Sequence, residues 1–206
     1  MSLWMLDFDG VFVDSLPLLH PAFRQALPER HRERFAQAEA FVGLFEDNFY
    51  ASIREFDLSE EELGSMQRAL ASASVRGMAS LPPVEGMREA AARLGASERL
   101  YVVTSNSEVT VGAYLEHWKI RGVRRVLGKE SGLSKIDKIA ALRDAHPASR
   151  SIYIGDTCGD MREARAAGVV PWGVAWGWHA PAKLRSAGAE EIVTHPSAFV
   201  AESPAR

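Results

Sequence analysis

Alternating strand and helix patterns over residues 83–194 constrain the fold of this chain most strongly. Short apolar runs with strand character are separated by stretches with helical periodicity, each about 10 to 15 residues long. The expected strands of this part are 99–103, 123–127, 151–154, 169–175 and 192–194. Such an alternation requires right-handed crossovers and forms a parallel sheet that is covered on both faces. The sequence therefore predicts an α/β fold with a Rossmann-like parallel sheet flanked by helices.

The N-terminus contributes one more strand, a short apolar run that begins at Leu3 and ends in two acids, Asp7 and Asp9. Because the acids are two residues apart, their side chains point the same way on an extended backbone. Gly10 allows a sharp turn directly after them. Open α/β sheets place their chemistry at the carboxyl ends of their strands, so these acids are candidates for a reaction site.

Between the first strand and the alternating region the pattern is helical. Most aromatic residues of the segment 15–82 lie between Phe35 and Phe56, which indicates the core of a small helical bundle, and Ser59 with Glu62 forms a capping-box sequence. We expect an inserted all-α cap at 15–82, and a catalytic core made of 1–14 and 83–206. Within the core, Val84–Leu94 has the pattern of an amphipathic helix, which Gly95 is expected to end.

Composition excludes several classes of function. The chain has 206 residues and a formal net charge of −3 without a long basic block, so nucleic acid is not an expected partner. Cys158 is the single cysteine, which fits a reducing compartment. No apolar run approaches the roughly 20 residues that span a bilayer, and no signal-type segment is visible. We expect a cytoplasmic protein without membrane contact, as a monomer or small homo-oligomer.

Polar side chains follow three of the expected strands, where a shared sheet edge would bring them together. They are Asp7 and Asp9, then Thr104, Ser105 and Asn106, then Asp156 and Asp160, with Lys135 at the start of a helix in the same half. Acids, a hydroxyl and a cation are the groups that phosphoryl transfer uses. The joint occurrence is far more specific than any one motif.

Charge balance predicts a metal at this edge. Two carboxylates 4 Å apart repel each other by about 4 kcal/mol at a protein-like effective dielectric constant. Lys135 alone cannot balance Asp7, Asp9, Asp156 and an incoming phosphate group. A hard divalent cation resolves the excess, and Mg²⁺ suits few carboxylates together with water and phosphate. The motifs contain no cluster of histidine and cysteine, which argues against zinc.

These segments resemble the four motifs of the haloacid dehalogenase superfamily, in the family's order. The first is Asp7–Ser15, the second Thr104, the third Lys135, and the fourth Gly155–Asp160. The resemblance covers 3–15 and 82–200. The continuation through 166–169 and 173–177 resembles the phosphoglycolate-phosphatase-like branch, whose members carry a helical cap and hydrolyse small phosphorylated metabolites.

The resemblance implies a role for each matching residue. Asp7 would be the nucleophile that forms an aspartyl-phosphate, and Asp9 the acid and base. Mg²⁺ would be held by Asp7, the backbone carbonyl of Asp9, and Asp156. The phosphoryl oxygens would be bound by Lys135 and by Thr104 with its neighbours Ser105 and Asn106.

Several alternatives stay open at this point. Asp160 is placed with the metal-site acids, either as a direct ligand or as a group that orients Lys135 or a metal-bound water. Its alternative role is a helix N-terminal acid favoured by the helix dipole. Lys129 rivals Lys135, which lacks the proline that commonly follows the third motif. The favoured function is a Mg²⁺-dependent phosphatase acting on a small phosphomonoester. Its rivals are a phosphosugar mutase of the β-phosphoglucomutase type and a non-enzymatic phosphoacceptor regulatory domain.

Overall fold

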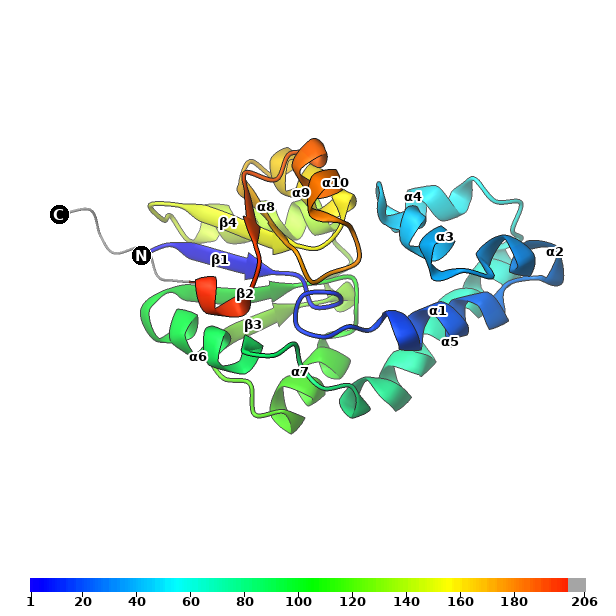
Figure 1. The fold of residues 1–206 in the computed structure, drawn as a ribbon, viewed down its shortest axis with the longest axis horizontal. Coiled ribbons are helices and arrows are strands. Elements are labelled where there is room, and N and C mark those ends of the chain that lie inside the picture. Colours follow the sequence, from blue (N-terminus) through cyan, green and yellow to red (C-terminus); the bar gives the residue numbers. More distant parts are fainter. Residues whose placement is uncertain (200–206) are drawn as a thin grey trace.

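Six parallel strands form one sheet in the computed structural model, which describes residues 1–199 (Figure 1). The strands are β1 (Leu3–Leu6), β2 (Arg99–Val103), β3 (Val123–Leu127), β4 (Ser151–Gly155), β5 (Val170–Val174) and β6 (Glu191–Val193). They lie in the order β3-β2-β1-β4-β5-β6, so β1 pairs with both β2 and β4. Leu3 is in register with Arg99 on one side and Ser151 on the other. The predicted parallel α/β sheet is confirmed.

Helices cover both faces of this sheet (Figure 1). They are α6 (Met87–Ser97), α7 (Glu108–His117), α8 (Lys135–Ala145), α9 (Cys158–Ala166) and α10 (Pro181–Ala187). The period of two along β1 divides its side chains between the faces. Trp4 and Leu6 belong to the core under α6 and α7, whereas Leu3 and Met5 belong to the core under α8 and α9. All four are fully buried, as expected for the central strand of a parallel sheet.

Residues 16–77 form a helical segment beside the carboxyl edge of the sheet (Figure 1). Its helices are α1 (Leu16–Ala26), α2 (Glu29–Arg32), α3 (Ala38–Val42), α4 (Phe49–Arg54) and α5 (Glu60–Gly77). It has its own hydrophobic cluster, which includes Phe23, Phe35 and Phe41. The capping box predicted for Ser59 and Glu62 is present at the start of α5. The division of the chain into a core and a cap at 15 and 82 stays a prediction.

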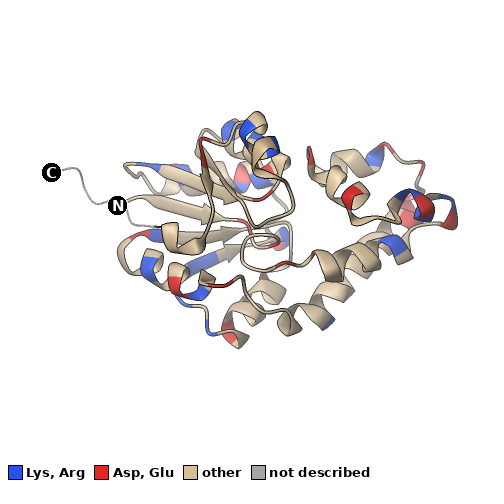
Figure 2. Ribbon diagram, viewed as in Figure 1, with Lys and Arg blue, Asp and Glu red and all other residues tan. Residues whose placement is uncertain are grey.

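Charged residues gather densely around α2, at the end of the helical segment far from the sheet (Figure 2). Arg30 of α2 pairs with Glu62 of α5 at 2.8 Å, and no residue of α2 is buried. This cluster is the solvent-exposed face that the mixed charges of 29–34 indicate. In residues 1–199, no helix combines the length and the hydropathy that crossing a membrane requires.

The predicted end of the helix at Gly95 was wrong. The helix α6 begins at Met87, after a left-handed turn at Gly86, and continues through Gly95 to Ser97. Gly95 thus lies inside the helix. At this position α6 packs directly on the backbone of Gly122, and a Cβ atom on residue 95 would overlap that backbone. The glycine therefore serves a close helix-to-backbone contact, and not the left-handed C-terminal cap that its helical context suggested.

We expect Gly95→Ala to lower the free energy of unfolding by about 1–3 kcal/mol, because the added methyl group forces α6 away from Gly122. Gly112→Ala is the matched control. Gly112 lies inside α7 with open space around the position of its Cβ, so alanine there should stabilise by about 0.5–1 kcal/mol. Urea denaturation of both variants measures the difference. Equal effects would contradict the packing argument.

Candidate active site

The strand order brings three polar segments to one edge. Because β2 and β4 flank β1, the loops that follow these strands are neighbours at their carboxyl ends. Asp7 follows β1 directly, Thr104 follows β2, and Asp156 follows β4. The chain continues from β1 to its neighbour β2 and from β4 to its neighbour β5, so the two connections lead away from each other. This divergence leaves a crevice at the carboxyl edge between β1 and β4. Asp7, Asp9, Thr104, Ser105, Asn106, Lys135, Asp156 and Asp160 all line one cavity there, so every predicted site residue is brought together.

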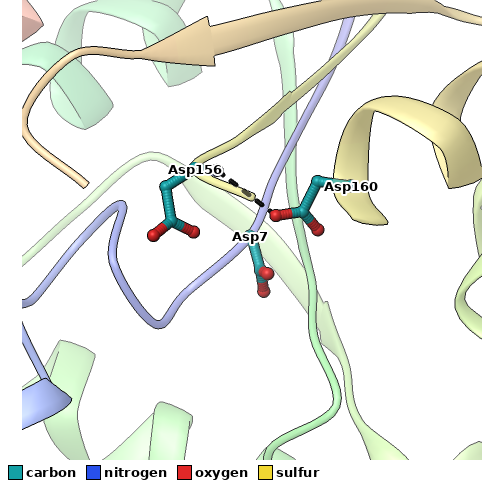
Figure 3. A group of neighbouring side chains, drawn as sticks. All are labelled: Asp7, Asp156 and Asp160. Atoms are coloured by element: carbon teal, nitrogen blue, oxygen red, sulfur yellow. Dashed lines mark hydrogen bonds between the residues drawn. The ribbon is translucent and has the colours of Figure 1, made fainter. Parts of the chain in front are cut away.

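Three buried acids form the floor of the cavity. One carboxylate oxygen each of Asp7, Asp156 and Asp160 lies within 4.8 Å of the others (Figure 3). Burial raises the pKa of Asp7 to about 7. Burial, and then the nearby charge of Asp160, raise the pKa of Asp156 well above its usual value. Burial, together with the neighbouring acids, therefore disfavours the ionised form of both carboxyl groups, and a nearby cation would offset this.

Lys135 is the cation of this cluster. Its Nζ lies 2.8 Å from Asp7 Oδ2 and 2.8 Å from Asp160 Oδ1, with only 10% of its side chain exposed. Burial alone would lower the pKa of Lys135, but the charges of Asp160 and Asp7 hold it well above the usual value. The lysine begins α8, as the sequence predicts, and the side chain of Ser134 caps the N-terminus of this helix. The ammonium group therefore stays charged and faces the two acids.

Asp160 combines two of the roles that the sequence left open. Its Oδ2 accepts hydrogen bonds from the backbone N–H groups of Asp156 and Thr157 and from the Thr157 hydroxyl. With Thr157 it forms the capping box of α9, and its Oδ1 accepts from Lys135. Burial would raise the pKa of Asp160, but the ion pair with Lys135 keeps it below the usual value. This acid orients the lysine and the turn that carries Asp156.

The loop after β2 forms another side of the cavity. Thr104 is buried, and its Oγ1 accepts a hydrogen bond from the backbone N–H of Asn106 at 3.0 Å. Asn106 Nδ2 donates to Asp9 Oδ2 at 3.2 Å. Burial raises the pKa of Asp9 above its usual value. Asp9 therefore retains its proton to higher pH than an exposed aspartate does, which suits a proton donor.

Two glycines allow the close approach of loops around Asp156. Gly10 has a φ of 74°, and a Cβ atom there would overlap the Asp156 carboxylate. A Cβ at Gly177 would overlap the same side chain. Beyond Gly177, the backbone N–H of Trp178 donates to Asp156 Oδ2 at 2.8 Å. The acid is thus enclosed by two loops that are far apart in the sequence.

The donor set fits a hard divalent cation. Asp7 and Asp156 are buried carboxylates with raised pKa values, and their oxygens lie close enough to share one ion. Mg²⁺ prefers such oxygen ligands and lowers the free energy of clustered acids. Asp160 accepts hydrogen bonds from Lys135, the Tyr153 and Thr157 hydroxyls and two backbone N–H groups. Asp7 accepts from Lys135 and the N–H of Phe8, and Asp156 from the N–H of Trp178, so these two acids keep more lone pairs for an ion.

Sequence reasoning missed two buried basic residues. Lys138 donates to the carbonyl oxygen of Thr104 at 2.9 Å and so supports the loop after β2. Its spacing of three from Lys135 places both on one face of α8, which is a signal that the sequence does contain. His179 lies in the loop between β5 and α10 and is buried there: its Nδ1 accepts from the N–H of Cys158, and its Nε2 lies 3.2 Å from the carbonyl oxygen of Val42. Nothing local in the sequence marks this contact.

His179 belongs to a set of contacts between the sheet half and the helical segment. Asn48 Nδ2 donates to Glu163 at 3.0 Å, and Lys183 pairs with Glu46 at 2.5 Å. Arg162 also donates to the backbone carbonyl of Glu46. These contacts hold the loop before α4 over the acid cluster, so the helical segment forms one wall of the cavity.

Comparisons with known proteins agree with this geometry. The family model for haloacid dehalogenase-like hydrolases matches residues 4–174. A phosphoglycolate phosphatase of Synechococcus elongatus is 25% identical over 212 residues, covering 96% of this chain and 94% of that protein. A solved haloacid dehalogenase-like hydrolase from Streptococcus pneumoniae is 22% identical with a TM-score of 0.75, over 96% of this chain and 95% of the other. A related structure from Bacteroides fragilis is 18% identical with a TM-score of 0.79, over 94% and 96% of the two chains.

An α/β sheet with acids at its carboxyl edge defines the class of protein, and the family match is long enough to be decisive. The chain belongs to the haloacid dehalogenase-like hydrolases. The resemblance predicted from the four motifs is thereby confirmed.

We expect millimolar Mg²⁺ to raise the melting temperature of the protein by several degrees, because an ion that binds only the folded state stabilises it. Asp156→Asn should remove most of this rise without lowering the melting temperature of the metal-free protein. Asp47→Asn, at an exposed acid of the cavity wall outside the cluster, is the control and should keep the rise. Thermal scans with and without Mg²⁺ measure both. An undiminished rise in Asp156→Asn would contradict the assigned site.

Proposed function

We propose that this hydrolase is a Mg²⁺-dependent phosphatase that cleaves a small phosphomonoester through an aspartyl-phosphate on Asp7. The observation that carries the proposal is the placement of Asp7 against Lys135, with Asp9 and Thr104 lining the same cavity. A nucleophile, a cation, a proton donor and a hydroxyl are the groups that this reaction needs. The name of the Synechococcus elongatus relative supports the same reaction class.

In the first step a carboxylate oxygen of Asp7 attacks phosphorus, and the bond from phosphorus to the ester oxygen breaks. The carboxylic acid of Asp9 gives its proton to the departing oxygen, which leaves as an alcohol. The raised pKa of Asp9 supports this role, and the bond from Asn106 holds its carboxyl group in place. The products of this step are the alcohol and an acyl phosphate on Asp7.

In the second step Asp9, now a carboxylate, takes a proton from water as the water attacks phosphorus. The bond from phosphorus to the Asp7 oxygen breaks, which releases inorganic phosphate and restores both acids. Lys135 and Thr104 bind the phosphoryl oxygens, with Ser105 and Asn106 beside them on the same loop. Each contributes donors that are already in place before the charge spreads over these oxygens.

Asp7, the backbone carbonyl of Asp9, and Asp156 would hold the Mg²⁺, with Asp160 orienting Lys135. When bound, the ion supplies positive charge that lets phosphate approach an acidic site. Lys135 would then interact with both the Asp7 carboxylate and the phosphoryl group of the substrate. Positive charge beside Asp7 would lower the pKa of about 7 that burial gives this acid, and would so favour the ionised nucleophile.

The helical segment would act as a cap over this site, within the predicted bounds 15–82. Its contacts through Asn48, Glu46 and Val42 support a closed position over the acids. A closed cap excludes bulk water while the ester reacts, and opening it releases the products. The same segment lines the part of the cavity that the leaving group would occupy.

Substitution of the two N-terminal acids tests this proposal. Asp7→Asn should abolish phosphate release, because no phosphoenzyme can form. Asp9→Asn should reduce turnover by about 10² to 10⁴-fold, with a smaller loss for aryl than for alkyl phosphates, since aryl leaving groups need less protonation. Phosphate release with Mg²⁺ and with chelator is the assay. Turnover by Asp7→Asn, or isomerisation of a sugar phosphate without phosphate release, would contradict the proposal.

Substitution of the two candidate phosphate-binding lysines, Lys135 and Lys129, should lower activity by different amounts. Lys135→Met should lower kcat/KM by about 10² to 10³-fold, because a buried cation next to the nucleophile is lost. Lys129→Met should change it by less than about fivefold, because Lys129 is an exposed residue of the same cavity and solvent screens its charge. Melting temperatures control for folding, and Lys135→Arg retains the charge. A larger loss of kcat/KM in Lys129→Met than in Lys135→Met would identify Lys129 as the phosphate-binding lysine.

A further inference from the structure

The cavity has two ends of different chemistry. One end, formed by the loops after the strands, carries the buried acids and Lys135. The other end is formed mainly by the helical segment 16–77 together with Trp178. The whole cavity measures about 450 Å³, within the range of pockets for small organic ligands. If phosphate occupies the acidic end, the second end must accommodate the group esterified to it.

Aromatic rings form one side of that second end. Phe45 and Phe49 are stacked, with centroids 4.9 Å apart and an interplanar angle of 22°. Trp178 meets Phe45 edge-on at 5.0 Å. Phe45 and Phe49 line the cavity and are only half-buried, so part of each ring remains open to a ligand. Rings in this arrangement favour another flat apolar group placed against a face or an edge.

The helix α5 forms the opposite side with one face. Gln67, Leu70, Ala71 and Ser74 line the cavity at spacings of three and four residues, which places them on the same side of the helix. Two of these side chains are apolar and two are neutral hydrogen-bonding groups. This face therefore offers contact to an uncharged ligand, and it has no group that pairs with a charge.

The distribution of charged side chains in the cavity also favours an uncharged group at its second end. Among the residues of 16–77 that line it, the only charged side chain is the acid Asp47. The two lysines of the lining belong to the sheet half: Lys135 is paired with Asp7 and Asp160, and Lys129 is exposed, so solvent screens its charge. A second anionic group on the substrate would meet Asp47 and Glu163 without a cation from the helical segment.

We infer that the esterified group is an uncharged alcohol bearing a flat, apolar ring, so that the substrate is a monophosphate of this type. The inference rests on the proposed function and narrows its substrate. The inferred substrate differs from the one for which the Synechococcus elongatus relative is named, because phosphoglycolate carries a carboxylate as a second anionic group. The open faces of Phe45 and Phe49 contact the ring, and Gln67 and Ser74 offer neutral polar contacts.

Four esters in two matched pairs test the substrate class with the Mg²⁺-loaded full-length protein. Ethyl phosphate and 2-phosphoglycolate differ in a carboxylate at similar size. Benzyl phosphate and 4-carboxybenzyl phosphate differ in a carboxylate on the same ring. Burial of the ring should raise kcat/KM for benzyl over ethyl phosphate by about 10- to 100-fold. Each carboxylate should lower kcat/KM by about tenfold or more.

Variants of the cavity wall provide a second readout. Gln67→Lys places a cation on the cavity face of α5 and should raise the rate on 2-phosphoglycolate relative to ethyl phosphate by about tenfold. Gln67→Met, similar in length and uncharged, should leave that ratio unchanged. Phe45→Ala should reduce the preference for benzyl over ethyl phosphate by about tenfold, and Phe45→Leu should reduce it less. Gln67 is exposed on its helix, so both of its variants should fold.

The outcomes separate this inference from the proposed function. Phosphate release from the esters, with the uncharged ring preferred and Gln67→Lys shifting the ratio, supports both. Phosphate release with the carboxylates preferred, or with no preference for the ring, overturns the inference and leaves the phosphatase intact. No phosphate release from any ester overturns the proposed function, and the inference with it.

Discussion

The burial of several carboxylates at one sheet edge is the constraint on which the rest of this structure depends. Asp7, Asp156 and Asp160 lie within 4.8 Å of one another, where like charges repel and water is scarce. Lys135 offsets part of this cost by pairing with two of them. Backbone N–H groups from the turn after β4 and from Trp178 offset another part. What remains uncompensated is the basis for expecting a divalent cation.

This electrostatic requirement explains features that would otherwise look unrelated. Gly10 and Gly177 allow two loops to close around Asp156, because any side chain at either position would occupy the place of the carboxylate. Lys138 is buried, and desolvation is the main reason why its pKa is lowered. Its ammonium group donates a hydrogen bond to the carbonyl oxygen of Thr104. Each element around the edge is therefore arranged to place donors near concentrated negative charge.

Division of labour between the two parts of the chain follows from their composition. The sheet half carries the ionisable groups, which need fixed positions and a rigid parallel sheet to hold them. The helical segment contributes aromatic rings, neutral polar groups and a single acid, Asp47, to the same cavity. Under the proposed function the acid cluster would serve many phosphate esters, and the choice among them would depend on the wall that contacts the rest of the molecule. Contacts such as Asn48 with Glu163 keep that wall in position.

Local sequence alone determined the strands, the four motifs and their order, because hydrophobic periodicity and short polar loops are properties of neighbouring residues. Strands β2 and β3 and the start of α8 at Lys135 were predicted to the residue. Tertiary structure decided what depends on approach between distant segments. Gly95 is a packing contact with Gly122 and not a helix end, Asp160 serves Lys135 and the α9 cap together, and His179 bridges to Val42. The contacts of Gly95 and His179 have no local signature, because their partners lie in segments distant along the chain. The cap that Asp160 forms with Thr157 is local and visible in the sequence, whereas its pairing with Lys135, 25 residues away, depends on the fold.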